Sequence, residues 1–140
     1  MLKVYLAARY SEKNKMSAQA DIFKSRGIIV TSTWLEEAHS PDVQMSEIHT
    51  DLLTCYAEND LRDVIAADWL VFSSVEPTTP TVRGGRHVEF GYALAMNKHI
   101  LVVGPKENIF HHLSDIWHVS DWESALNFLV SKKGELKWEL

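Results

Sequence analysis

The sequence has little cysteine, no cluster of basic residues and no long apolar run. Its 140 residues include a single cysteine, Cys55, which excludes an internal disulfide and any zinc site built from several cysteines. Nineteen acidic residues outnumber 14 lysines and arginines, giving a formal net charge of -5, and no basic stripe offers the footprint that a nucleic-acid polymer needs. Because neither a signal peptide nor an apolar run of about 20 residues is visible, we expect a cytoplasmic protein without a membrane span.

Motifs that identify several common enzyme classes are also missing. There is no Gly-x-x-x-x-Gly-Lys loop, and Ala7-Ala8-Arg9-Tyr10 follows the first apolar run where dinucleotide-binding proteins have Gly-x-Gly-x-x-Gly. The Gly-x-Ser-x-Gly of serine hydrolases is absent too. His87-Val88-Glu89 matches the start of the zinc-deaminase signature, but the Pro-Cys-x-x-Cys that completes it does not follow. The remaining histidines show no metal-ligand spacing, so we expect neither a metal nor a cofactor.

What is present is typical of a globular protein. Hydrophobic residues make up 46% of the chain and charged residues 24%, without repeats or low-complexity segments. A chain of this length buries roughly two thirds of the surface that it exposes when unfolded. We therefore expect residues 1–140 to form a single domain, with a candidate tail over 133–140.

Short apolar runs alternate with helical patterns along the chain. We expect strands at 2–8, 28–34, 68–74, 99–103 and 116–119, and helices from about 12 to Gly27, over 48–67, over 86–97 and from Asp121 to about 130. The polar segment 35–46 should form a loop long enough to act as a flap. This alternation predicts an α/β fold, a doubly wound and mostly parallel five-stranded sheet with helices on both faces, of the flavodoxin or Rossmann type. Ligands of such sheets bind beyond the strand carboxyl ends, so the loops after the first, third and fourth strands should face one cleft.

Residues 83–97 form the most distinctive stretch, a glycine-led loop that runs into a short helix. Val88, Tyr92, Ala95 and Met96 recur at helical spacing, and Glu89, Tyr92, Ala93 and Met96 lie along the adjoining stripe. We expect this helix to pack against the sheet. Glu89 is the one carboxylate among them, close enough to the helix N-terminus for backbone amides and the dipole to favour its ionised form. From the residues alone, both a structural and a catalytic role fit Glu89.

Three features converge on the expected cleft: residues 5–9 at the end of the first strand, Asp60 on the helix over 48–67, and residues 83–89. Asp60 lies in a polar part of its helix, where a solvated surface aspartate is the alternative. Cys55, in the same helix, is expected to be a small core residue. Trp34, at a strand end beside the flap, is a candidate for contact with a planar ligand.

In their order along the chain, these residues resemble the nucleoside 2-deoxyribosyltransferases. The likeness is carried by Tyr5 in Val-Tyr-Leu-Ala-Ala, by Asn59-Asp60-Leu61 before Ala-Asp-Trp-Leu-Val, and by the Gly-Gly-Arg-His-Val-Glu-Phe-Gly-Tyr-Ala-Leu-Ala block that starts at Gly84. It spans about residues 2–113. The resemblance implies transfer of 2-deoxyribose between nucleobases through a covalent glycosyl-enzyme intermediate, without a cofactor, on a doubly wound fold that forms homo-oligomers.

The resemblance also implies roles for single residues. Glu89 matches the nucleophile, Asp60 the second acid, and Tyr5 the residue that orients the nucleophile. A neighbouring subunit completes such sites from the segment after the fourth strand, which here would bring His111 across the interface. The other candidate contacts to a nucleoside or deoxynucleotide and a free nucleobase are Ala7, Arg9, Trp34, Arg83, Gly84, Gly85 and Arg86.

One position departs from the family pattern. Some of these transferases carry an aspartate six residues before the nucleophile, whereas this chain has Arg83 there. The related 2′-deoxynucleoside 5′-monophosphate N-hydrolases place a phosphate-binding serine at that point, and an arginine, with Arg9 and Arg86 nearby, is equally suited to grip a phosphate. A hydrolase is therefore the alternative reading, and a non-catalytic nucleotide-binding domain is a third.

Overall fold

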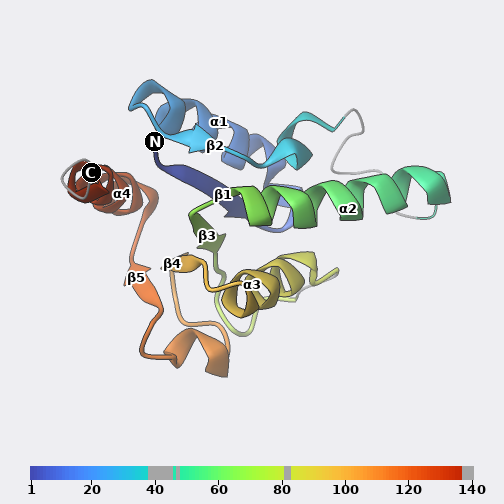
Figure 1. Cartoon of the computed structure of the whole chain (residues 1–140). Helices are drawn as coiled ribbons and strands as arrows, with labels where there is room; N and C mark the ends of the chain where they lie inside the picture. Colours follow the sequence, from blue (N-terminus) through green and yellow to red (C-terminus); the bar gives the residue numbers. More distant parts are fainter. Residues whose placement is uncertain (38–45, 47, 81–82, 137–140) are drawn as a thin grey trace.

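The structure is a computed structural model that describes residues 1–37, 46, 48–80 and 83–136, with side chains described as far as residue 133. Its strands are β1 (Lys3–Ala7), β2 (Ile29–Val30), β3 (Trp69–Ser73), β4 (His99–Val103) and β5 (Trp117–Val119). Its α-helices are α1 (Lys13–Ser25), α2 (Thr50–Ala66), α3 (Gly85–Ala95) and α4 (Trp122–Leu136). Short 3-10 turns are η1 (Tyr10–Glu12), η2 (Thr33–Glu36) and η4 (Ile109–His112). Figure 1 shows their arrangement.

The five strands form one parallel sheet in the order β2-β1-β3-β4-β5. The chain passes from β1 outward to β2 and then returns across β1 to β3, so the strand order reverses between β1 and β3. All five residues of β3 are buried, as expected for a central parallel strand that is covered on both faces. The predicted doubly wound five-stranded sheet is therefore confirmed.

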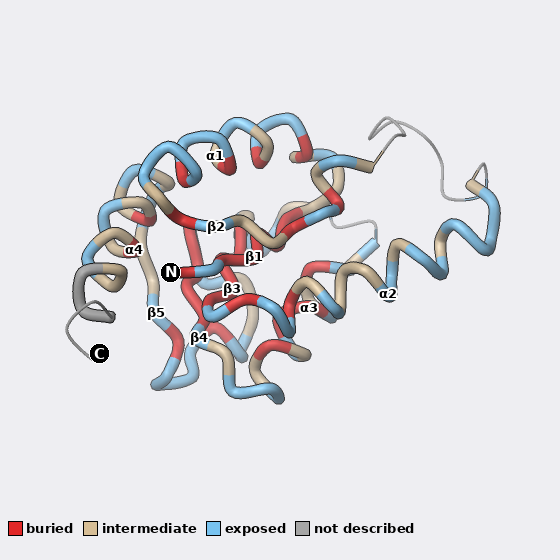
Figure 2. The backbone as a smooth tube through the Cα atoms, turned by 45° about the horizontal axis from the view of Figure 1, so that its top comes forward, coloured by how far each residue is buried: buried red, intermediate tan, exposed pale blue. Residues whose placement is uncertain are grey.

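Helices cover both faces of this sheet, and side chains alternate between two apolar layers. Tyr5 and Phe72 point into the layer that also contains Val64 and Ala93, from the side of α2 and α3. The neighbouring strand residues point into the opposite layer, which contains residues of α1 and α4. Figure 2 shows this buried sheet enclosed by helices whose outer faces are exposed.

The second strand is much shorter than predicted, because side chains replace its backbone ladder. The backbone ladder to β1 ends with the Thr31 amide, which donates to the Val4 carbonyl at 2.8 Å, and Leu6 of β1 finds its hydrogen bonds elsewhere. The Leu6 amide donates to Ser32 Oγ at 2.6 Å, and the indole Nε1 of Trp34 donates to the Leu6 carbonyl at 2.8 Å. Both polar groups of Leu6 are thus satisfied without a strand beside them, and residues 33–36 are free to form η2.

The predicted inner face of α3 is right at Glu89 and Ala93 and wrong at Val88 and Met96. Val88 is 65% exposed and Met96 is 45% exposed. The buried positions are one step round the helix, at Arg86, Glu89, Phe90 and Ala93. Two of these four residues are charged, so the buried stripe is not apolar in the sequence. The spacing of the apolar residues in α3 therefore indicated a more exposed face.

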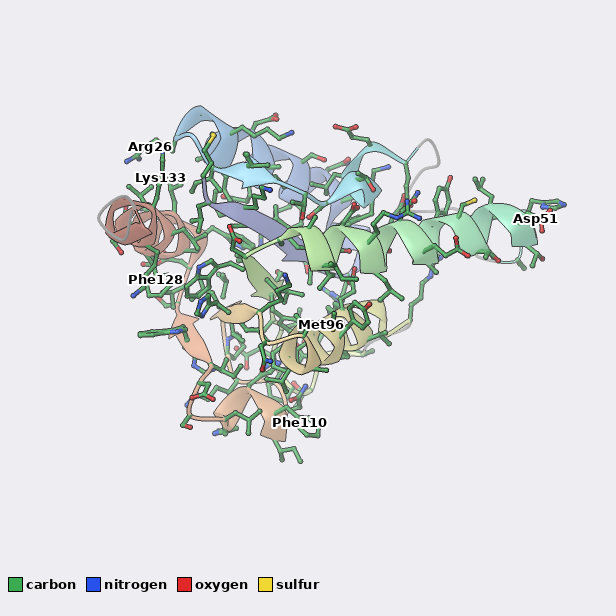
Figure 3. The ribbon with its side chains drawn as sticks, in the orientation of Figure 1. Arg26, Asp51, Met96, Phe110, Phe128 and Lys133 are labelled. Atoms are coloured by element: carbon green, nitrogen blue, oxygen red, sulfur yellow. The ribbon has the colours of Figure 1, made fainter. Side chains whose placement is uncertain are left out.

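The helix α2 confirms the predicted helix, but most of its residues are not core. Figure 1 shows its N-terminal half extending beyond the sheet, and Figure 3 labels Asp51 at that outer end. Cys55 lies on this half and is exposed, so its prediction as a core residue is wrong. The sheet does not extend under this half of α2, so among the described residues Cys55 has no core to pack into.

The C-terminal helix is longer than predicted. Asp121 accepts a hydrogen bond from the Ser124 amide at 2.8 Å and so caps the helix start as expected, but α4 continues to Leu136. Lys133, where a tail was expected to begin, donates to the Arg26 carbonyl at 3.0 Å, and both residues are labelled in Figure 3. The expected flap at 35–46 lies mostly outside the described residues, as does the end of the tail. Among the described helices, none combines the length and apolar character needed to cross a bilayer.

Candidate active site

A pocket of about 570 Å³ opens where the strand order reverses. Its lining comes from the segments that follow β1, β2 and β3 and from α2 and the start of α3, and its volume is in the range of small-molecule sites, roughly 300–1,000 Å³. The loops after the first and third strands thus face one cleft, as predicted. The loop after β4 does not line it, because that loop turns under α3, where Glu107 bonds Arg86.

Glu89 and Tyr5 meet at this pocket from two elements. Glu89 on α3 lines the pocket and is 9% exposed, and the hydroxyl of the fully buried Tyr5 on β1 donates a hydrogen bond to its Oε2. Burial raises the pKa of Glu89 to about 8. The expectation that helix amides favour the ionised form is wrong, since Glu89 is the fifth residue of α3 and lies past the free amides of the first turn.

Asp60 lines the same pocket from α2. Its Oδ1 is buried and has no hydrogen-bond partner among the described residues. Burial, with the nearby charges of Glu37 and Asp63 adding to it, raises the pKa of Asp60 to about 7. Two carboxyl groups on separate helices therefore share one pocket, and both can exchange protons near neutral pH.

Two arginines and two glycines lie at the pocket's edge. The pocket is lined by Arg9 and Arg83, and the Arg9 Nε lies 3.6 Å from Glu12 Oε1. Gly84 and Gly85 also line the pocket, and Gly84 adopts a φ of 73° as the N-cap of α3, a left-handed conformation that favours glycine. The turn into α3 therefore brings backbone close to any ligand.

The remaining predicted contacts divide between pocket and core. Trp34 lines the pocket as predicted. Ala7 is fully buried in β1, and the lining begins at its neighbour Ala8. Arg86 also lines the pocket, but its two terminal nitrogens donate to Glu107 at 2.7 and 2.6 Å. The guanidinium of Arg86 is therefore already paired, and its contact with a phosphate stays a prediction.

His111 lies in the core beneath the pocket. It is fully buried, its ring packs against Phe72 and Phe90 at 4.9 and 5.1 Å between centroids, and its Nδ1 accepts from the Glu107 amide at 2.9 Å. The prediction that it crosses to a neighbouring subunit is wrong, since its own chain encloses it. Its neighbour Phe110 lies at the surface instead, as labelled in Figure 3.

The sequence reasoning missed one corner of the pocket. The Nζ of Lys13 donates to the Glu37 carbonyl and lies 3.3 Å from the Tyr10 hydroxyl, and the Tyr10 ring packs 5.7 Å from that of Trp34. A signal existed in the sequence, because Lys13 stands at the start of the buried stripe of α1. In the part of the chain that the structure describes, no group of three His, Cys, Asp or Glu side chains could hold a metal ion.

Comparisons with known proteins reveal relatives in structure rather than in sequence. No family model matches the sequence, and no curated protein matches it. A 2-deoxyribosyltransferase from Bacillus psychrosaccharolyticus superposes with a TM-score of 0.67 at 19% identity, covering 89% of this chain and 90% of its own. A conserved protein from Enterococcus faecalis V583 gives a TM-score of 0.63 at 14% identity, covering 95% and 99%.

A third structure, the CMP N-glycosidase of Clostridium botulinum, gives a TM-score of 0.57 at 20% identity and covers 91% of this chain and 97% of its own. Identities this low establish a common fold and leave the reaction to be argued from the site. The chain therefore has the doubly wound α/β fold found in a 2-deoxyribosyltransferase and a CMP N-glycosidase, as its sequence predicted.

Proposed function

We propose that this protein is a nucleoside 2-deoxyribosyltransferase that works through a glycosyl ester on Glu89. The observation that carries the proposal is the buried Tyr5 and Glu89 pair, a carboxyl group held by a hydroxyl at the wall of a nucleoside-sized pocket. The fold shared with a 2-deoxyribosyltransferase supports it. In the proposed mechanism Tyr5 holds Oε2 and leaves Oε1 of Glu89 to react.

In the first step, the Glu89 carboxylate attacks C1′ of the donor nucleoside. The bond from C1′ to the base nitrogen breaks, and its electron pair leaves with the base, which takes a proton from Asp60. The transition state resembles an oxocarbenium ion, so a carboxylate beside C1′ stabilises its positive charge before the ester forms.

In the second step, a ring nitrogen of the acceptor base attacks C1′ of the ester. The bond from C1′ to the Glu89 oxygen breaks and restores the carboxylate, while Asp60 takes the proton that the incoming nitrogen loses. The first step needs Glu89 ionised and Asp60 protonated, and the second step needs Asp60 ionised. Burial raises the two pKa values to about 8 and about 7, so a pH near neutral leaves a fraction of each group in the state that the first step needs.

A second candidate is an N-glycosidase that hydrolyses nucleoside 5′-monophosphates. It is favoured by Arg9 and Arg83, two arginines that line the same pocket as Glu89 and carry the charge that a phosphate needs. The fold shared with a CMP N-glycosidase also supports it. Here water replaces the acceptor base and releases the sugar phosphate from Glu89.

Chromatography of reaction products separates the two candidates. The purified protein is given either a deoxynucleoside with a different free base, or a deoxynucleoside 5′-monophosphate alone. A new nucleoside that forms only with the acceptor base supports transfer, whereas free base from the monophosphate supports hydrolysis. Arg83→Gln is the matched variant, because it should raise KM for the monophosphate and leave nucleoside transfer little changed.

Trapping tests the covalent step. A donor nucleoside with a 2-fluoro substituent slows breakdown of the ester, so mass spectrometry should find one added sugar on Glu89. An unmodified mass under conditions of turnover would remove Glu89 as nucleophile. If both substrate mixtures yield no product while nucleosides still bind, the protein is a binding domain and the proposed activity is wrong.

We also propose that the protein acts in the cytoplasm as a homo-oligomer. Ile109 and Phe110 of η4 are exposed apolar side chains, the kind of surface that a second copy can cover. Sedimentation of the purified protein tests this, and a monomer at the concentration of the activity assay contradicts it.

A further inference from the structure

We propose that Glu107 is a positioning residue for Glu89: by clamping Arg86 it fixes the first turn of α3 and keeps the charge of Arg86 away from the nucleophile. The inference rests on the proposed function. Glu107 is outside the pocket lining, and nothing in the sequence pattern marked it.

Glu107 lies in the loop after β4 and contacts polar groups from two other segments that meet beside the site. Its Oε1 accepts from Arg86 Nη1 at 2.7 Å and from the Val75 amide at 3.0 Å. Its Oε2 accepts from Arg86 Nη2 at 2.6 Å and lies 3.2 Å from His87 Nε2. The side chains of Arg86 and Glu107 are 1% and 8% exposed. One carboxylate thus joins the loop after β3, the start of α3 and the loop after β4.

The clamp is held rigidly from its other side. The backbone amide of Glu107 donates to His111 Nδ1 at 2.9 Å, and the His111 ring is wedged between Phe72 and Phe90. Phe90 is the residue that follows Glu89. A shift of Glu107 would therefore move both the turn before Glu89 and the packing after it.

Arg86 and Glu89 lie on one face of α3, three residues apart, where side chains are neighbours. Arg86 nevertheless does not draw the pKa of Glu89 down, which burial alone raises. For Glu107, burial would raise the pKa, but the hydrogen bonds from Arg86 and Val75 outweigh it and lower the pKa. The charge of Arg86 is therefore compensated by Glu107 and does not set the protonation state of Glu89.

Glu107→Gln tests this, since it preserves shape and removes one charge. Because a glutamine holds the Arg86 guanidinium less tightly, the first turn of α3 should shift. We expect kcat at the pH optimum to fall about 10- to 100-fold with KM nearly unchanged, the size of effect that a small misplacement of a reacting group produces. The acid limb of the pH profile should also move down by about one pH unit, because a cation beside Glu89 favours its carboxylate.

Several other polar groups surround Glu89, and they are the same in the wild type and in Glu107→Gln. Tyr5 contacts it from β1, Asp60 lines the pocket from α2, and Arg9 and Arg83 lie in the adjoining loops. The double variant Arg86→Met with Glu107→Gln removes both members of the pair. It should return the acid limb to its wild-type position while kcat stays low, a reversal that a merely structural role would not produce.

Glu123→Gln is the matched control, because Glu123 is exposed in the first turn of α4. If Glu107→Gln lowers only the melting temperature and leaves kcat and the pH profile as in wild type, the positioning role is wrong. If the single variant does not fold, the neutral double variant decides instead: a wild-type kcat overturns the proposal and a reduced kcat supports it.

A direct titration separates this inference from the proposed reaction. The carboxyl carbon of Glu89, followed by NMR in ¹³C-labelled protein, should titrate at lower pH in Glu107→Gln than in wild type. This result stands even if the wild type forms no product, which would refute the proposed function alone. An identical Glu89 titration in both proteins would refute the role of Glu107.

Discussion

Replacing Glu89 by glutamine should abolish turnover and make the protein more stable at neutral pH. Burial raises the pKa of this carboxyl from 4.5 to about 8 in the folded protein, whereas in the unfolded chain it titrates in water at its ordinary value. Between these two pH values the folded state binds the proton more tightly. The stability of the wild type therefore falls as pH rises from about 4.5 to about 8, and glutamine, which cannot ionise, escapes this loss.

The size of the effect follows from the two pKa values. Each pH unit between them is worth about 1.4 kcal/mol, so the gain of Glu89→Gln has a ceiling of about 5 kcal/mol above pH 8. At pH 7 the same relation gives on the order of 3 kcal/mol, and at pH 5 less than about 1 kcal/mol. The Tyr5 hydroxyl stabilises the carboxylate through its hydrogen bond and brings the measured gain below the ceiling.

Urea denaturation at pH 5, 6, 7 and 8 measures this gain as a difference between variant and wild type. We expect the two curves to differ by less than about 1 kcal/mol at pH 5 and to separate progressively up to pH 8, with m values unchanged. Glu123→Gln, on the exposed surface of α4, should show no such trend. A Glu89→Gln protein that is no more stable than wild type at pH 8, or whose gain is the same at every pH, would refute the argument from burial.

Three further predictions concern the site and the loop behind it. Burial raises the pKa of Asp60 to about 7, so the rate should decline as pH rises above the optimum and Asp60 loses its proton. Asp60→Asn should remove this alkaline limb from the pH profile of the remaining activity. Tyr5→Phe removes the hydroxyl that holds Glu89 and should lower kcat by about 10- to 100-fold with a small change in KM, measured by steady-state kinetics. Gly104→Ala should destabilise the protein by about 1–3 kcal/mol in urea, because Gly104 has a φ of +111° and an added Cβ would lie 2.7 Å from Ser74 Oγ.

These predictions have their own controls and contrary outcomes. An alkaline limb that survives in Asp60→Asn would assign that proton to another group, with Asp51→Asn, exposed at the outer end of the same helix, as the control. A kcat unchanged in Tyr5→Phe would remove the orienting role of Tyr5. Gly91→Ala is the control for Gly104, since an added Cβ there meets nothing within 4 Å, and equal stabilities of the two variants would contradict the steric argument.

Local patterns sufficed for most of the fold. β1, β3 and β4 are continuous apolar runs because both faces of a central parallel strand are covered, and their alternation with helices limited the topology to a doubly wound sheet. The pattern of apolar residues gave a wrong strand end where a side chain, in place of a neighbouring strand, bonds the backbone of β1. Trp34 continues the apolar run of the second strand, yet its indole bonds the Leu6 carbonyl, and the strand ends four residues earlier, at Val30.

The candidate site was predictable in its residue types and incompletely in its arrangement. The block around Glu89 and the positions of Tyr5 and Asp60 are recognisable by resemblance, and all three lie at or beside one pocket. The contacts of Arg86 and His111 could not be predicted from the sequence. Both residues bond Glu107, which lies in a loop without a periodic pattern.

Most strands and helices, and the acids that could do chemistry, are predictable because they depend on neighbours within a few residues along the chain. Which of those acids are buried, and what they contact, depends on segments that are far apart in the chain. Tyr5 and Glu89 are 84 residues apart in sequence, and Arg86 and Glu107 are 21 apart. A pKa depends on the solvent and charge that surround a group in space, so the protonation of Glu89 and Asp60 is fixed by the packing of α2 and α3 around the pocket.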